Sequence, residues 1–241
     1  MNKLLRIIFF FVSVSSLGQQ IQVSQLEEEA KTNKRLLPRY GLLPKSEVEI
    51  AADQDFVTKT MEQTQFNGDY RAASNHLIKL GFNYLYRRDL KTAMYRFNQA
   101  YLLDSTNDDI YWGYGAFYMS LGNYEEGKKQ YERGLQINPN NTHLLTDYGT
   151  YFLSQYHGLK QAGHEGDAMT NLESAIKHLE KSLKLDNEDQ NTAYKLSICY
   201  WLKGDCEKAW LHYDNCKELG GQPITEDYTA ALKEKCKKKG K

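Results

Sequence analysis

The sequence predicts an all-α protein built from stacked helical hairpins, and two observations support this prediction. A glycine followed three residues later by an aromatic residue recurs every 34 residues, at Gly81, Gly115 and Gly149. After the first glycine, the small residues Ala93 and Ala100 lie on one helical stripe, and the later repeats keep small residues in these places. This pattern is typical of hairpins whose two helices cross closely. We expect a right-handed solenoid of about four hairpins, with a capping helix at each end.

The composition argues against a nucleic-acid partner. The chain has 31 basic and 31 acidic residues, so its formal net charge is zero. A protein that binds nucleic acid needs a broad basic face. The basic residues gather only in residues 233–241, which contain six lysines and predict a solvated basic tail.

Residues 1–18 predict a secretory signal peptide. Lys3 and Arg6 precede an apolar run over residues 7–14, and the small residues of the segment 15–18 follow. The apolar run is shorter than the roughly 20 residues that span a bilayer, so we expect no stable membrane span. Cleavage after Gly18 would give an exported protein, periplasmic or secreted.

Residues 19–66 form an N-terminal extension of different character. Residues 36–44 are apolar but contain two prolines and a glycine, which predicts an extended segment rather than a helix. Capping-box spacing at Ser46–Glu49 precedes a predicted capping helix over residues 53–63. The extension either covers the first hairpin or places residues 36–44 along the hairpins as an internal ligand.

Residues 67–222 hold the four predicted hairpins, and residues 223–241 hold a last capping helix, at about 225–235, followed by the basic tail. The third hairpin is longer than the first by 14 residues, inserted at about 156–169. We expect the insert to lengthen the connection between two helices, with the second helix starting near Asp167. Its two histidines and two carboxylates suggest a metal site, but glycine-rich spacing does not hold ligands at fixed distances. We therefore expect no metal and no cofactor.

Catalytic motifs are missing from the sequence. It has no Cys-x-x-Cys pair, no phosphate-binding glycine loop and no nucleophile elbow. We therefore expect a non-enzymatic protein. The distant alternative is an enzyme or metal binder that uses the 156–169 insert.

The repeats resemble the tetratricopeptide repeat, whose pattern is an aromatic residue, Leu-Gly, Tyr, Ala, an aromatic residue, Ala and Pro. The second repeat carries this pattern with Tyr111, Tyr114, Gly115, Tyr118, Gly127, Tyr131, Gly134 and Pro139. The first carries Leu80, Gly81, Tyr84, Ala93, Phe97 and Ala100, with Ser105 in the proline position. The resemblance covers roughly residues 74–222 and extends, more loosely, to secreted bacterial tetratricopeptide repeat proteins of unassigned role.

The resemblance implies a scaffold that binds a protein or peptide in a concave groove lined by the first helix of each hairpin. In the family register the groove positions fall on Ile78, Phe82, Leu85, Tyr86, Trp112, Met119, Tyr194, Ile198 and Trp201. This lining is apolar and aromatic, so we expect a partner with an apolar segment. The alternative is a mainly structural protein whose groove is filled by its own N-terminal segment. The sequence does not indicate an oligomeric state.

The four cysteines all follow residue 198, which suggests a disulfide in an exported protein. Cys206 and Cys216 are ten residues apart on one predicted helix, about 15 Å, which is too far for a bond. In the register of the repeats, Cys199, Cys206 and Cys236 lie at the same end of the hairpins. We predict a bond between Cys206 and Cys236, with Cys199 as the rival partner and Cys216 free. Four reduced thiols used in packing are the alternative.

Overall fold

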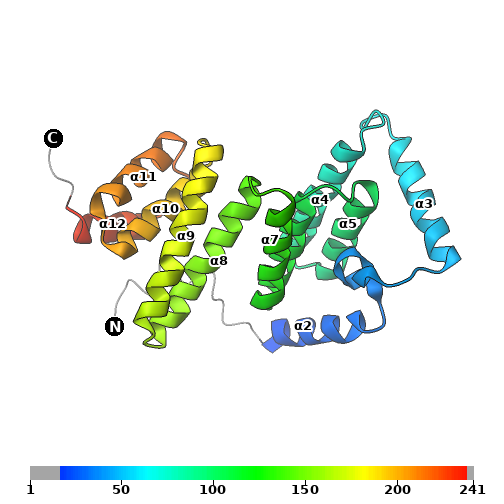
Figure 1. Ribbon diagram of the computed structural model, residues 1–241, viewed down its shortest axis with the longest axis horizontal. Helices are drawn as coiled ribbons and strands as arrows, with labels where there is room; N and C mark the ends of the chain where they lie inside the picture. Colours follow the sequence, from blue (N-terminus) through cyan, green and yellow to red (C-terminus); the bar gives the residue numbers. More distant parts are fainter. Residues whose placement is uncertain (1–16, 238–241) are drawn as a thin grey trace. The chain divides into compact units, whose positions relative to one another are not determined.

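The computed structural model describes residues 17–237, which form two compact units, residues 17–139 and residues 140–237. All regular secondary structure in the described chain is helical, which confirms the all-α prediction (Figure 1). The predicted signal peptide falls outside these residues except for its last two positions, and residues 238–241 of the tail also fall outside. Among residues 17–237, no helix combines the length and the apolarity needed to cross a membrane.

The first unit contains an N-terminal extension and two helical hairpins. The extension consists of α2 (Leu17–Ala30), the short 3-10 helices η1 (Lys34–Leu36) and η2 (Pro38–Leu42), and α3 (Glu47–Met61). The hairpins are α4 (Tyr70–Tyr86) with α5 (Leu90–Leu103), and α6 (Asp109–Ser120) with α7 (Tyr124–Ile137).

The second unit contains two more hairpins and a final helix, as expected from the sequence. The hairpins are α8 (Thr142–Gln161) with α9 (Glu165–Leu185), and α10 (Gln190–Lys203) with α11 (Cys206–Glu218). The final helix is α12 (Glu226–Lys235), whose buried residues Tyr228, Ala231 and Leu232 form its apolar side.

Side-chain caps start most of these helices. Asp69, Asp89, Asn123, Asn141 and Asp205 each accept a hydrogen bond from the backbone N–H three residues later. Such a bond satisfies one of the four N–H groups that a helix start leaves without a partner. The predicted capping box at Ser46–Glu49 is also present and begins α3 at Glu47, earlier than the predicted residue 53.

Rings from the second helix of each hairpin of the first unit lie against the glycines of the first helix. A Cβ atom added to Gly81 would lie 2.4 Å from the Phe97 ring, and one added to Gly115 would lie 2.1 Å from the Tyr131 ring. Both distances are shorter than any van der Waals contact, so only glycine admits the ring at these places. Close side-chain packing is therefore the physical reason for the repeated glycine, and at Gly149 of α8 the Leu179 side chain takes the place of the ring, at 2.7 Å.

The 156–169 insert is not a loop, contrary to the prediction. It lengthens α8 and α9 to 20 and 21 residues, and only residues 162–164 connect them. The apolar stripe continues through the insert because Tyr156 on α8 and Ala168 on α9 are buried together with Leu172. Gly158, which suggested a loop, is exposed within α8 and has no neighbour that would meet a Cβ atom.

Residues 36–44 are not extended, which corrects a second prediction. Arg39, Tyr40, Gly41 and Leu42 all have a left-handed backbone, with φ between 53° and 65°. Each non-glycine residue in this conformation costs roughly 1–2 kcal/mol, so the surroundings must hold it. We call residues 33–45 the strap. Its two 3-10 helices pack on α5, the second helix of its hairpin, and Arg39 also contacts Tyr111 and Tyr114 of α6. The internal-ligand alternative placed these residues in a groove of first helices, whereas most of the strap lies on a second helix.

One buried side chain of α5, Asn98, holds the strap in place. Its Oδ1 accepts hydrogen bonds from the Arg39 N–H (2.8 Å) and from the Tyr114 hydroxyl (2.7 Å). Its Nδ2 donates to the backbone carbonyls of Arg35 (2.8 Å) and Leu37 (2.9 Å). The amide therefore makes four hydrogen bonds at a site that is only 1% exposed.

We predict that Asn98→Ala lowers the free energy of unfolding by about 3 kcal/mol, because it leaves several buried polar groups without a partner. Urea denaturation of the full chain measures this change. Gln99→Ala, at the next position of the same helix, is the matched control and should cost under about 1 kcal/mol. An Asn98→Ala protein as stable as the control would show that the strap does not depend on this amide.

Candidate functional site

The predicted groove residues of the first unit form an aromatic row on α4 and α6. The rings of Phe82 and Trp112 lie 4.0 Å apart between centroids, and the Tyr86 ring lies 6.0 Å from that of Phe82. On the core side of the row, the Phe97 ring of α5 packs edge-on against the Phe82 ring, with 5.4 Å between the centroids. We call Phe82, Tyr86 and Trp112, with the neighbouring Ala116, the α4–α6 face.

The side chains of this predicted set differ in how much surface they expose to a partner. Ile78, Phe82 and Leu85 are 4–7% exposed, so they are core residues. Trp112 and Met119 are half-buried, and Met119 packs beside Gly127 of its own hairpin. Tyr86, in contrast, is 76% exposed. The surface that this row offers is therefore made by Tyr86 and the open parts of Trp112.

The predicted groove residues of the last hairpin lie against α12, which buries Trp201 and covers part of Tyr194. The Tyr228 ring of α12 is 1% exposed and lies 5.3 Å from the Tyr194 ring and 6.2 Å from the Trp201 ring. Trp201 is only 5% exposed, and Ile198 is half-buried against the same core. Trp201 is therefore a core residue, whereas Tyr194 and Ile198 stay half-buried, and their assignment to partner binding remains a prediction.

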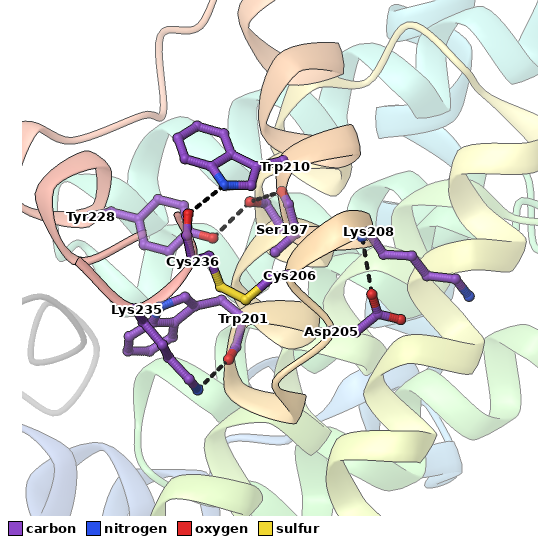
Figure 2. Close-up of a disulfide and its surroundings, with 10 residues drawn as sticks. Ser197, Trp201, Asp205, Cys206, Lys208, Trp210, Tyr228, Lys235 and Cys236 are labelled. Atoms are coloured by element: carbon purple, nitrogen blue, oxygen red, sulfur yellow. Dashed lines mark hydrogen bonds between the residues drawn. A yellow bond between two sulfur atoms is a disulfide. The ribbon is translucent and has the colours of Figure 1, made fainter. Parts of the chain in front are cut away.

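A disulfide between Cys206 and Cys236 joins the end of α12 to the start of α11 (Figure 2). This is the pairing that the repeat register predicts. The end of α12 is also held by two hydrogen bonds, from Trp210 Nε1 to the Cys236 carbonyl (2.8 Å) and from Lys235 Nζ to the Trp201 carbonyl (2.6 Å). Together these contacts close the last hairpin.

The other two cysteines, Cys199 and Cys216, are free and buried. Burial raises the pKa of the Cys199 thiol to about 12 and also raises that of Cys216. Because a thiolate is the nucleophile in disulfide exchange, Cys199 is a poor rival for the Cys206–Cys236 bond.

A pocket that sequence reasoning missed lies between the strap, α3 and α5. Its volume is about 250 Å³, and its lining comes from all three elements: Arg35, Tyr40, Lys45, Glu49, Ala52, Asp53, Phe56, Tyr95, Asn98, Gln99 and Leu102. We call it the strap pocket. No sequence signal pointed to it, because it exists only once the left-handed strap lies on α5.

Most charges of the strap pocket are paired with one another. Lys34 Nζ lies 2.8 Å from a Glu49 carboxylate oxygen, and Lys45 forms an ion pair with Asp53. The hydrogen bond from Lys34, with those from Ser46, lowers the pKa of Glu49 to about 2. Lys45 also lies 3.5 Å above the Tyr40 ring, and burial raises the pKa of the Tyr40 hydroxyl.

The insert does not bring its polar residues together as a site. His157 lies on α8, where burial lowers its pKa, whereas His164 precedes α9 and Glu165 pairs with Lys160. Across residues 17–237, no three His, Cys, Asp or Glu side chains are grouped closely enough to hold a metal ion.

The comparison with protein families bears on the hairpins just described. The tetratricopeptide repeat profile matches residues 84–146, which include the turn between α4 and α5 and the whole of α6 and α7. This chain contains tetratricopeptide repeats. A comparison with curated proteins gave no match.

Several solved structures are similar to this chain at low identity. PilF of Pseudomonas aeruginosa is 20% identical over 64% of this chain and 79% of its own, with a TM-score of 0.36. MamA of Desulfovibrio magneticus, from residue 41 to its end, is 18% identical over 66% and 99%, with a TM-score of 0.33. YrrB, described as a tetratricopeptide repeat protein with an unusual peptide-binding site, is 20% identical over 74% and 97%, with a TM-score of 0.29. At such TM-scores these similarities carry no inference about residues or partners.

We predict that replacing both Cys206 and Cys236 by serine lowers the free energy of unfolding of this tetratricopeptide repeat protein by about 3 kcal/mol. The bond closes a loop between positions 30 residues apart, and its loss frees the unfolded chain. Thermal unfolding with and without dithiothreitol measures the effect. The reductant should destabilise the wild type and leave the double variant unchanged, whereas equal sensitivity of both proteins would place the bond elsewhere.

Proposed function

We propose that this tetratricopeptide repeat protein is a non-enzymatic scaffold that binds a protein or peptide with an apolar segment on the α4–α6 face. The fold itself is that of a protein-interaction scaffold, and its family is typically non-catalytic. The proposal places the contact in the first unit.

The exposure of Tyr86 is the observation that supports this proposal most strongly. A tyrosine in a water-exposed position gains free energy when a partner covers its ring, at about 25 cal/mol per Å² of apolar area. Tyr86 is next in line to Phe82 and Trp112, so a partner that covers it meets a continuous aromatic row. Aromatic side chains at such places are the usual anchors of protein interfaces.

The apolar character of the row decides the class of partner. Phe82, Trp112 and Ala116 carry no formal charge. The Phe97 ring, which packs against Phe82, is also apolar. A partner therefore gains from apolar side chains on a helix or an extended segment, and gains little from acidic or basic ones. In the last hairpin, Tyr228 of α12 packs on Tyr194 and Trp201, so the exposed Tyr86 sets the first unit apart.

We predict that Tyr86→Ala weakens the binding of selected peptides at least about tenfold, because aromatic anchors contribute about 2 kcal/mol or more at an interface. Peptides selected from a random displayed library against the wild-type protein provide the ligands, and fluorescence anisotropy provides the dissociation constants. The stability of the variant should change by less than about 1 kcal/mol, since the side chain is largely exposed.

Tyr124→Ala is the matched control, because Tyr124 is 41% exposed at the start of α7. It should leave peptide binding unchanged. Peptides that bind Tyr86→Ala as tightly as the wild type would exclude the α4–α6 face as the site.

We also propose that the protein is exported and acts in the periplasm or outside the cell. The basic, apolar and small residues of positions 1–18 support this, as does a disulfide between Cys206 and Cys236, since such bonds persist in oxidising compartments. N-terminal sequencing of protein isolated from its native cells should give a mature chain that starts near Gln19. Native protein that retains Met1 in a cytosolic fraction would contradict the proposal.

A further inference from the structure

We propose that the strap pocket binds a small organic monocarboxylate with an apolar body, held by the Arg35 guanidinium. This site is independent of the α4–α6 face, since its lining comes from the strap, α3 and α5. Four features of the pocket lead to this ligand: an unpaired cation, the paired carboxylates beside it, an apolar wall and a small volume.

Arg35 is the charged group of the pocket that has no counter-ion. Its guanidinium lies over the Tyr95 ring, with the central carbon 4.3 Å from the ring centroid. Within residues 17–237 no carboxylate forms an ion pair with it, although four other ionic groups gather nearby. A guanidinium stacked by its face keeps its N–H donors along the edge, and that edge matches the two oxygens of a carboxylate.

The two carboxylates of the pocket already have cationic partners, so they do not favour a cationic ligand. Glu49 is engaged by Lys34 at 2.8 Å and by the Ser46 backbone N–H at 2.7 Å, and Asp53 is engaged by Lys45. With Lys34 included, the local charge is three positive groups against two negative groups. A ligand that brings one negative charge completes this balance, whereas a cationic ligand would add to the excess.

The remaining lining sets the size and polarity of the ligand. Ala52 and Phe56 of α3 and Leu102 of α5 contribute the apolar part of the lining. A volume of about 250 Å³ is below the range of roughly 300–1,000 Å³ that is usual for drug-sized ligands. The pocket therefore suits a body about as large as one apolar amino-acid side chain.

The strap gives the pocket a fixed shape. Tyr40, which lines the pocket and is 8% exposed, is one of its left-handed residues. Asn98 binds the strap directly before Tyr40, through the Arg35 carbonyl and the Arg39 N–H. Strained backbone of this kind is concentrated at ligand sites, where the surrounding structure holds it.

Such a carboxylate can come from a free organic acid or from the last residue of a polypeptide. Three probes distinguish these sources on the full chain by isothermal titration calorimetry: 4-methylpentanoate, N-acetyl-leucine and N-acetyl-leucinamide. We expect saturable binding of one or both carboxylates, and binding of the amide at least about tenfold weaker, because the amide lacks the charge. Tighter binding of N-acetyl-leucine than of 4-methylpentanoate indicates a polypeptide end, and the reverse order indicates a free acid.

Two variants test the site itself. Arg35→Gln should weaken carboxylate binding about tenfold or more, whereas Arg133→Gln, an exposed arginine on α7, should leave it unchanged. Ala52→Phe should block both carboxylates by filling the pocket, and circular dichroism should show that each variant keeps its helical content. The proposal is overturned if neither carboxylate binds at millimolar concentration, if the amide binds equally well, or if Arg35→Gln binds like the wild type.

Discussion

The hairpins of the first unit depend on an aromatic ring that lies against glycine. The Phe97 ring of α5 lies where a Cβ atom of Gly81 or of Gly113 would otherwise be, at 2.4 and 2.5 Å. One side chain thus sets how closely α4 and α6 approach α5. It also meets Phe82 edge-on, which fixes the ring that stacks with Trp112. The α4–α6 face therefore lies on a core whose close packing requires glycine at positions 81 and 113.

The last hairpin of the second unit has polar groups at the same helix crossing. Ser197 takes the glycine position in α10, and its hydroxyl donates to the Ala209 carbonyl of α11 (2.8 Å). The same hydroxyl lies 2.6 Å from the Tyr228 hydroxyl of α12 (Figure 2). The Ser197 side chain is larger than glycine at this close helix crossing. It is tolerated because its hydroxyl has two hydrogen-bond partners. This arrangement ties α12 to the last hairpin and buries Trp201 beneath it.

The features that the sequence predicted well are those that depend on nearby residues. The 34-residue spacing of Gly81 and Gly115 predicted the hairpins, and Asp and Asn residues at cap positions predicted where helices begin. The repeat register predicted the Cys206–Cys236 pair. The tetratricopeptide repeat pattern placed Phe82 and Trp112 on one face, where the structure also has them.

The features that the sequence did not predict depend on contacts between distant residues. The left-handed strap at Arg39–Leu42 needs Asn98, which lies some 59 residues along the chain from Arg39. The burial of Trp201 needs Tyr228 of α12, which no repeat position specifies. The 156–169 insert contains glycines that favour a loop, but its apolar stripe pairs across α8 and α9 and keeps both helical. In each of these cases tertiary packing outweighs the local pattern.

A double-mutant cycle between Gly81 and Phe97 tests the packing on which the hairpins and the α4–α6 face depend. Gly81→Ala alone should lower the free energy of unfolding by about 1–3 kcal/mol, although alanine favours a helix over glycine by about 1 kcal/mol. In a Phe97→Val background the ring atoms are gone, so the same substitution should be nearly neutral or stabilising. We predict a coupling of at least about 1 kcal/mol between the two positions, measured by urea denaturation. Effects that add within about 0.3 kcal/mol would contradict the account.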